Sequence, residues 1–174
     1  MCIRDRDYAD LIELCESVSD DTVKVSPANI NAPDQVVVSG DVEAVDSFSN
    51  KAKEHGARRV MPLNVSGAFH SHLMKDAQDE FRTFVESIEF KDAKIPVIQN
   101  VSAQPETDSE TIKKQLVEQI TSPVRFVECI ETAVENGVTS GLEVGPKKVL
   151  NGLTRKINKS IKVKNIDTLD QVKE

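Results

Sequence analysis

His70 is the residue in this chain best placed for acid–base chemistry. It lies within residues 63–74, where an apolar segment that we expect to be a strand gives way at Gly67 to a loop and then a helix. Histidine is the one side chain whose unperturbed pKa lies near neutrality, so at the end of a rigid element it can accept and return a proton. A lone histidine after a strand is more often a capping or surface residue, and these residues alone leave both interpretations open.

His72 follows two positions later and invites a metal-binding interpretation of the pair. Two histidines without a placed Cys, Asp or Glu fall below the ligand count of a zinc site, so we expect no metal here and assign His72 to the start of the following helix. The three cysteines, Cys2, Cys15 and Cys129, form no CxxC pair. This pattern favours reduced cysteines in a cytoplasmic protein.

The composition limits the classes of partner. The chain has 174 residues with 29 acidic and 22 basic side chains, and its formal charge of −7 argues against nucleic acid because phosphate binding needs a basic footprint. It contains no apolar run of about 18 residues and no signal-peptide pattern, so we expect no membrane partner.

Three separated blocks carry a family resemblance. Residues 26–40, 65–74 and 142–150 resemble the malonyl-CoA:acyl carrier protein transacylases, in that family's order and with similar spacing. The similarity extends from about Asp7 to the C-terminus. Three blocks in order are a far more specific signal than one.

The resemblance implies an acyl transfer in fatty-acid synthesis. In that family a serine attacks the thioester of malonyl-CoA, and the phosphopantetheine thiol of acyl carrier protein then takes the malonyl group. Such ping-pong chemistry needs a base for each nucleophile, and no cofactor. His70 matches the family's catalytic histidine, and Gln119 matches the residue whose backbone carbonyl orients it. The alternative interpretation is that Gln119 is only a polar residue near the end of a helix.

The sequence departs from the family in one essential respect. The family's nucleophile lies in a Gly-His-Ser-x-Gly turn, and no Gly-x-Ser-x-Gly occurs in this chain. The arginine that grips the malonyl carboxylate and the glutamine-rich turn of the oxyanion hole are missing too. We therefore expect a C-terminal part of the enzyme that is inactive alone. Residues 1–6 fit no periodic pattern and are interpreted as a non-native start.

Three residues resemble the family's substrate-binding positions. Phe69 precedes the base in a form associated with malonyl over methylmalonyl selectivity, because a bulky ring leaves little room for an α-methyl group. Asn29 and Asn31 share one face of an extended segment, and their amides suit the polar groups of a pantetheine arm. Ordinary packing for Phe69 and a turn role for the asparagines are the competing interpretations.

Arg58 and Arg59 form a local basic pair in an acidic chain. Acyl carrier proteins are acidic, so this pair could steer their approach in spite of the net like charge, and the resemblance places a basic pair here too. A solvated strand end is the alternative.

The predicted elements define the fold class. Residues 7–66 read as helix, strand, turn, strand, helix, strand, which is a ferredoxin-like (split βαβ) subdomain without its first strand. Residues 67–174 alternate helices with strands, including 95–101 as a buried strand and a helix opening at Ser122-Pro123, and predict a largely parallel sheet. The overall expectation is an α/β protein: a truncated α/β-hydrolase-like acyltransferase domain with an incomplete ferredoxin-like subdomain.

Two other functions fit the same residues. One is a polyketide synthase acyltransferase fragment, which would share the three blocks. The other is a non-catalytic module that keeps the pantetheine and carrier-protein surfaces without the nucleophile. A coding sequence for Gly-His-Ser-x-Gly upstream of Met1 would favour the enzyme, whereas a true start codon there would favour the module.

Overall fold

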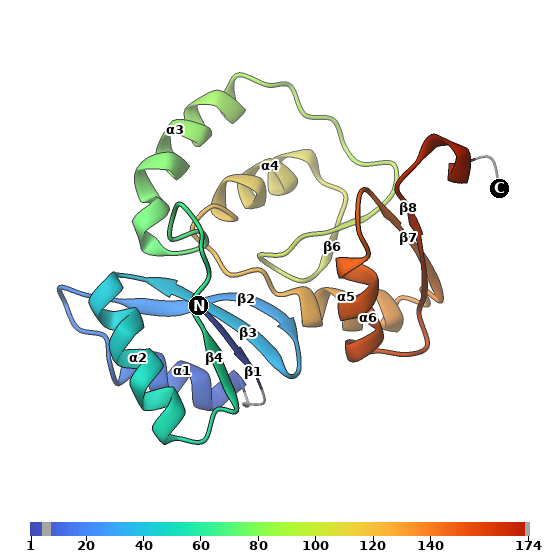
Figure 1. Cartoon of the computed structure of the whole chain (residues 1–174). Coiled ribbons are helices and arrows are strands. Elements are labelled where there is room, and N and C mark those ends of the chain that lie inside the picture. Colours follow the sequence, from blue (N-terminus) through green and yellow to red (C-terminus); the bar gives the residue numbers. More distant parts are fainter. Residues whose placement is uncertain (5–7, 173–174) are drawn as a thin grey trace.

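The first 61 residues form a four-stranded antiparallel sheet with two helices (Figure 1). The computed structural model describes residues 1–4 and 8–172. Strands lie in the order β2-β3-β1-β4, so that β1 pairs with β3 on one side and with β4 on the other. The elements are β1 (Cys2–Arg4), α1 (Tyr8–Glu16), β2 (Val25–Ala32), β3 (Gln35–Gly40), α2 (Val42–Glu54) and β4 (Arg59–Met61).

The expectation that the first strand is missing is wrong. Residues 2–4 form β1, in which Ile3 faces Val36 and Val60 and is only 1% exposed. Three residues are too few to show strand alternation in a sequence, and their strand conformation comes from pairing with β3 and β4. Residues 5 and 6, the rest of the expected non-native start, lie outside the described residues. The origin of this start stays a prediction.

Both helices of this unit pack on one face of the sheet. In α2 the buried Ala44, Phe48 and Ala52 recur every four residues, which is the spacing of one helix face. They meet Leu11 and Cys15 of α1 in a single apolar cluster. The cluster is completed by strand residues Ile3, Val25, Ile30, Val36 and Val38.

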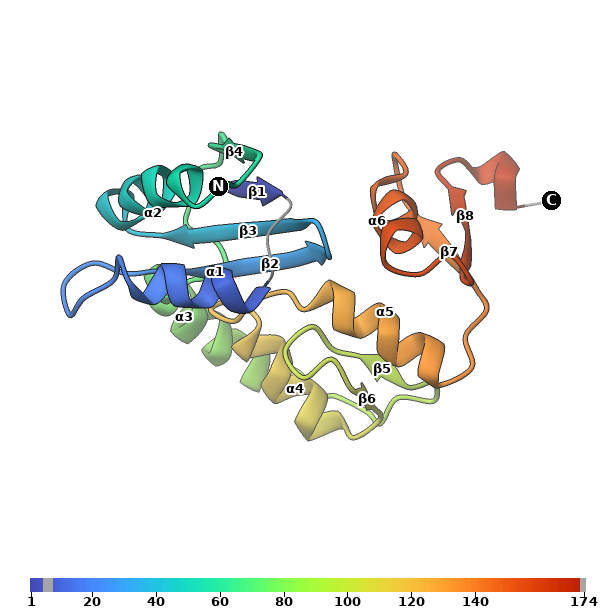
Figure 2. The ribbon, with the colours of Figure 1, turned by 90° about the horizontal axis from the view of Figure 1, so that it is seen from below.

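The chain beyond β4 forms helices with two short, separate strand pairs. Strands β5 and β6 are antiparallel, whereas β7 and β8 are parallel. Figure 2 shows α5 running from the four-stranded sheet toward the β7–β8 pair. No helix in the described ranges is long and apolar enough to cross a bilayer. The elements are η1 (His72–Met74), α3 (Lys75–Glu86), β5 (Val97–Ile98), β6 (Pro105–Glu106), α4 (Ser109–Glu118), α5 (Phe126–Glu135), β7 (Ser140–Val144), α6 (Val149–Ile157), β8 (Lys162–Ile166) and η2 (Leu169–Val172).

The expected largely parallel sheet is wrong for the described residues, which contain one parallel pair of named strands, β7 and β8. The predicted buried strand over 95–101 shrinks to β5, and Ile95 is 78% exposed. Pro96 cannot donate a ladder hydrogen bond. The chain then reverses, because the Ala103 amide donates to the Gln99 carbonyl at 2.8 Å. Residues 173 and 174, the end of the predicted second domain, are not described.

The segment before α5 is held by the first sheet. The Val124 amide donates to the Ala28 carbonyl, and its carbonyl accepts from the Ile30 amide, both at 2.8 Å. Val124 thereby forms a parallel bridge opposite Asn29. Because these backbone groups pair with β2, α5 begins at Phe126, three residues later than the predicted start at Pro123. The same bridge fixes the segment after α4 beside the sheet.

Candidate active site

His70 lies in the loop between β4 and η1 in a left-handed backbone conformation, with φ of 58°. For a residue with a Cβ this conformation costs about 1–2 kcal/mol, so the surrounding contacts must maintain it. Ser71 supplies two of them and is only 1% exposed. Its hydroxyl donates to the Ala68 carbonyl at 2.6 Å and accepts from the Leu73 amide at 3.3 Å. These bonds close the loop around His70.

The His70 ring meets the backbone at the end of α4. Its Nδ1 lies 3.0 Å from the carbonyl oxygen of Gln119. A carbonyl only accepts, so Nδ1 carries the proton and Nε2 is left as the free acceptor. The Gln119 side-chain nitrogen is 3.4 Å from Nδ1 and donates to the Ser122 carbonyl at 3.2 Å. The structure thus brings together two residues that are far apart in the sequence, through a backbone oxygen.

Gln78 ties the helix after His70 to the end of α4. It is only 6% exposed, and its side-chain amide donates to the Val117 carbonyl at 3.2 Å and to the Thr121 hydroxyl at 2.8 Å. Sequence reasoning missed Gln78 and Ser71. The available signals were a glutamine seven residues before the buried Val85, on the same helix face, and a serine just before a helix.

A cleft of about 940 Å³ opens beside His70. This volume lies within the usual range of small-molecule sites, about 300–1,000 Å³. His70, His72, Lys24 and Lys75 contribute polar groups to its lining, whereas Tyr8 of α1 contributes a ring. Burial, followed by the charge of Glu128, raises the pKa of the Tyr8 hydroxyl. Other lining side chains include Ile12, Pro27 and Pro123.

The two asparagines lie together on β2, and neither is among the residues that line the cleft beside His70. Asn29 and Asn31 are both half-buried and alternate with the buried Ala28, Ile30 and Ala32. Within the described ranges neither side chain forms a hydrogen bond, so both amides remain available to a ligand. Asn29 is the nearer to the segment that carries Gln119, because it pairs with Val124.

The remaining predicted residues are exposed. Phe69 is 48% exposed, and its ring lies over Gly67, where an added Cβ would meet the ring at 3.6 Å. Arg58 lies just before β4 and Arg59 begins it, and the Arg59 guanidinium contacts the Met61 sulfur at 2.9 Å. Neither arginine lines the cleft beside His70.

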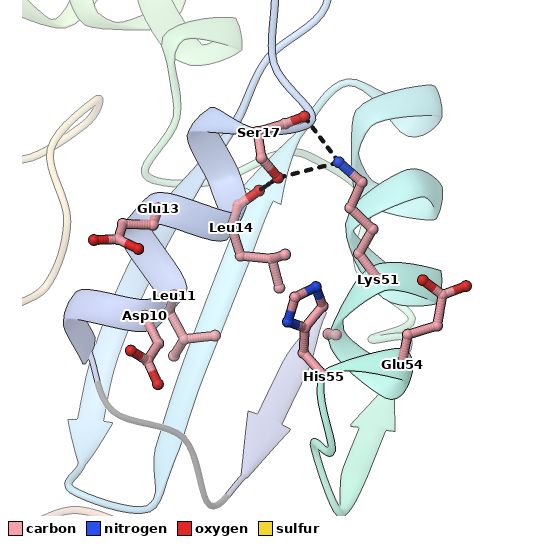
Figure 3. A pocket seen from close by; sticks show the side chains of 9 residues that line it. Asp10, Leu11, Glu13, Leu14, Ser17, Lys51, Glu54 and His55 are labelled. Carbon is pink, nitrogen blue, oxygen red and sulfur yellow. Dashed lines mark hydrogen bonds between the residues drawn. The ribbon is translucent and has the colours of Figure 1, made fainter.

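A second cleft, of about 460 Å³, lies between α1 and α2 (Figure 3). Its charged lining includes Glu13, Lys51 and His55. The Lys51 ammonium donates to the carbonyl and the hydroxyl of Ser17 at 3.0 and 3.2 Å, and that hydroxyl donates to the Leu14 carbonyl at 2.8 Å. These bonds occupy the Lys51 ammonium and the Ser17 hydroxyl.

Cysteines and metal ligands do not supply an alternative centre. Among the residues that the structure describes, no group of three or more His, Cys, Asp or Glu could hold a metal ion. Burial raises the pKa of the Cys15 thiol to about 12 and that of the Cys129 thiol to about 11. Such thiols stay protonated at neutral pH and are poor nucleophiles.

Comparison with known proteins adds a family and several relatives. The family described as "Acyl transferase domain" matches residues 6–172. A malonyl CoA-acyl carrier protein transacylase of Staphylococcus aureus is 48% identical over 167 residues, which are 96% of this chain and 54% of the relative. A Bacillus subtilis protein of the same name is 45% identical over 152 residues, covering 87% of this chain and 48% of the relative. The chain spans about half the length of these relatives.

Solved structures resemble the fold closely. An acyl carrier protein S-malonyltransferase from Vibrio cholerae superposes with a TM-score of 0.94 at 38% identity, covering 99% of this chain and 56% of that protein. A malonyl-transacylase solved in complex with a type II PKS acyl-carrier protein gives 0.92 at 38% identity, covering 98% of this chain and 55% of the other.

Proposed function

The chain belongs to the acyl transferase domain family, and from that premise we propose that it is part of an enzyme that moves malonyl from CoA to the phosphopantetheine thiol of acyl carrier protein in fatty-acid synthesis. The observation that carries the proposal is the His70 ring, held through Nδ1 by the Gln119 carbonyl with Nε2 left free at a cleft. An oriented neutral imidazole is what a general base requires.

In the proposed reaction His70 serves two nucleophiles in turn. Its Nε2 takes the hydroxyl proton of a serine, whose oxygen attacks the malonyl thioester, and the CoA thiolate leaves with that proton. The pantetheine thiol then gives its proton to Nε2, its sulfur attacks the ester, and the proton returns to the serine oxygen. This chain has no Gly-x-Ser-x-Gly turn, so the serine belongs to a part of the fold outside residues 1–174. No cofactor takes part.

The proposal also gives substrate-binding and partner-binding roles to the predicted residues around the base. Phe69 next to the base limits the room beside the acyl group, and the two unengaged amides of Asn29 and Asn31 suit the pantetheine arm. Arg58 and Arg59, both exposed, would steer the acidic carrier protein. The named relatives include a transacylase solved with an acyl-carrier protein, which supports the choice of partner.

The finer description of the fold is part of the same proposal. The β-α-β-β-α-β order of residues 1–61, with strands in the order β2-β3-β1-β4, supports a ferredoxin-like subdomain that has all four strands. The remaining residues would form the C-terminal part of an α/β-hydrolase-like domain. Unpaired cysteines in place of disulfides support a cytoplasmic location.

A chimera tests this function. The N-terminal half of the Staphylococcus aureus relative, up to the point where the similarity begins, is fused to residues 8–172, and malonyl transfer from malonyl-CoA to holo acyl carrier protein is measured. We expect transfer by the chimera and a fall of roughly 100- to 10,000-fold in His70→Ala. The matched control is His55→Ala at the exposed end of α2, which should retain activity.

A labelling experiment on the 174-residue chain alone provides a second test of the proposed function. Without the serine the chain should acquire no covalent label from radioactive malonyl-CoA, because a base without a nucleophile cannot form an acyl-enzyme. A folded chimera that transfers nothing, full activity in His70→Ala, or stable labelling of the chain alone would each contradict the proposal.

A further inference from the structure

Asp41 occupies the N-cap position of α2 yet does not cap it. Its backbone has the extended N-cap conformation, with φ of −64° and ψ of 144°, but its side chain accepts no hydrogen bond from the first turn of the helix. An N-cap aspartate normally accepts such a bond, which stabilises the helix. The carboxylate instead accepts from the Lys24 amide at 2.8 Å and lies 3.2 Å from Nε2 of His72. The Asp41 carboxylate thus contacts Lys24 and His72, both outside the helix, and forms no capping hydrogen bond within it.

His72 belongs to the same hydrogen-bonded turn as His70. The two residues flank Ser71, whose buried hydroxyl bonds to the backbone of Ala68 and Leu73. The turn therefore moves as one unit, and the strained backbone of His70 lies within it. The Gln119 carbonyl holds this unit through the His70 ring, and the Asp41 carboxylate holds it through the His72 ring.

We infer that Asp41 and His72 are positioning residues that fix the His70 turn against the four-stranded sheet. The inference rests on the proposed function, in which His70 is the base. The contact crosses from the turn between β3 and α2 to the loop that bears His70, so it joins the sheet to the catalytic loop directly. Gly40 strengthens the anchor, because the chain passes so near Lys24 at this turn that a Cβ on Gly40 would lie 2.0 Å from the Lys24 carbonyl oxygen.

The exposure of the pair argues for positioning over stability. The His72 and Asp41 side chains are 43% and 25% exposed, so solvent screens their attraction and the fold gains little from it. A left-handed residue, in contrast, keeps its geometry only where its neighbours over-determine it. Asp79 in α3 provides a matched control, because its carboxylate forms an exposed ion pair with Lys75 close in sequence to the turn. The hydrogen bonds of Asp79 reach Lys75 and Thr83, which lie outside the turn.

The tautomer of the His70 ring can be measured in the 174-residue chain itself, and this measurement decides the inference. Long-range proton–nitrogen spectra of the histidine-labelled 174-residue chain report which ring nitrogen carries the proton. We expect the Nδ1-protonated form to dominate for His70, and to give way to a mixture of tautomers in Asp41→Ala and in His72→Ala. The double variant should match either single variant, because both remove one interaction. The control Asp79→Ala should leave the His70 signals unchanged.

Conservative variants protect the test from simple misfolding. His72→Gln keeps a nitrogen donor near Asp41, and Asp41→Asn keeps an acceptor oxygen, so each should restore most of the wild-type His70 pattern. Unchanged His70 signals in both alanine variants with native circular dichroism, or an equal shift in Asp79→Ala, would overturn the inference. So would a failure of both conservative variants to restore the pattern.

Activity in the chimera separates this inference from the proposed function. Both alanine variants should lower kcat about 10- to 100-fold with little change in KM, since a displaced base slows the chemical step. Wild-type kcat in both variants would overturn the inference. If His70→Ala kept full activity the proposed function would fall, whereas the tautomer spectra would still decide whether Asp41 and His72 position the ring.

Discussion

The four-stranded unit and the chain beyond it differ in how their apolar side chains are used. Residues 1–61 enclose one apolar cluster in which Ile3, Val38 and Phe48 are at most 1% exposed. Beyond Met61 many large apolar side chains stay on the surface, among them Leu142 and Val144 of β7, which are 64% and 79% exposed. A parallel strand pair normally lies buried on both faces. We therefore expect most of the stability to come from the first region.

His70 lies where the two regions meet, and each holds it from one side. Asp41 belongs to the four-stranded unit of residues 1–61, which we call the closed unit. Gln119 belongs to the chain beyond Met61, which we call the open region. The bridge between Val124 and β2 keeps the two sides in register. The closed unit therefore acts as the rigid support for the His70 loop, whose other contact, to the Gln119 carbonyl, depends on a less well-packed region.

The largest expected effect is in the core of the closed unit. Phe48→Ala removes a fully buried ring and should lower the free energy of unfolding by about 3–5 kcal/mol. Leu142→Ala in β7 should change it by less than about 0.5 kcal/mol, as for other exposed sites. Urea titration followed by circular dichroism measures both. Similar losses in the two variants would refute the contrast, and Phe48→Leu gives a milder step if the alanine variant does not fold.

The close approach of the Gly40 backbone to the Lys24 backbone gives the second test of the closed unit. Gly40→Ala would place a Cβ 2.0 Å from the Lys24 carbonyl oxygen and 2.7 Å from the Val25 Cα, which are both backbone atoms that cannot turn aside. We expect a destabilisation of more than about 1 kcal/mol in the same urea titration. A neutral result would mean that this turn is looser than the structure shows.

Cysteine titration compares the two regions chemically. Burial raises the pKa of Cys15 to about 12 and that of Cys129 to about 11, from an ordinary 9.0. At pH 9 the thiolate fraction of Cys15 should be roughly tenfold below that of Cys129. Iodoacetamide labelling in a Cys2→Ser background, read by peptide mass spectrometry, should follow that order. Equal rates would show that opening of the fold, and not thiol ionisation, controls access.

The same shifts predict how stability depends on pH. Above about pH 9 the unfolded chain loses thiol protons that the folded chain retains, so the folded state binds more protons and its stability falls as pH rises toward 12. Below pH 9 both states keep these protons and the contribution is constant. Cys15→Ala should flatten the decline of the urea midpoint between pH 9 and 10.5. A decline of unchanged slope would assign the effect to other groups.

The smallest expected effect is a gain in the open region. Gly152 lies inside α6, and an added Cβ would meet no atom within 4 Å. Gly152→Ala should therefore stabilise the helix by about 0.5–1 kcal/mol, because glycine loses more conformational freedom on folding than alanine. Thermal unfolding measures the gain. A loss would indicate that the backbone at this position is not ordinary helix.

The sequence by itself determined the features that depend on neighbouring residues. Helix α2 is indicated by the helical spacing of Val45, Phe48 and Ala52, and it ends before Gly56, whose φ of 84° suits a glycine. The hairpin of β2 and β3 is set by two extended runs across a short turn at Pro33. In each case the hydrogen bonds or the buried face lie within a few residues of one another.

Other features were decided only by the tertiary structure. The strand at residues 2–4 exists because β3 and β4 offer backbone groups on both sides, and the late start of α5 exists because β2 engages Val124. The contact between His70 and the Gln119 carbonyl was implied by the family resemblance but by no local pattern, and the contact between His72 and Asp41 was implied by neither. These contacts join residues far apart in the chain, so packing, and not local spacing, brings them together.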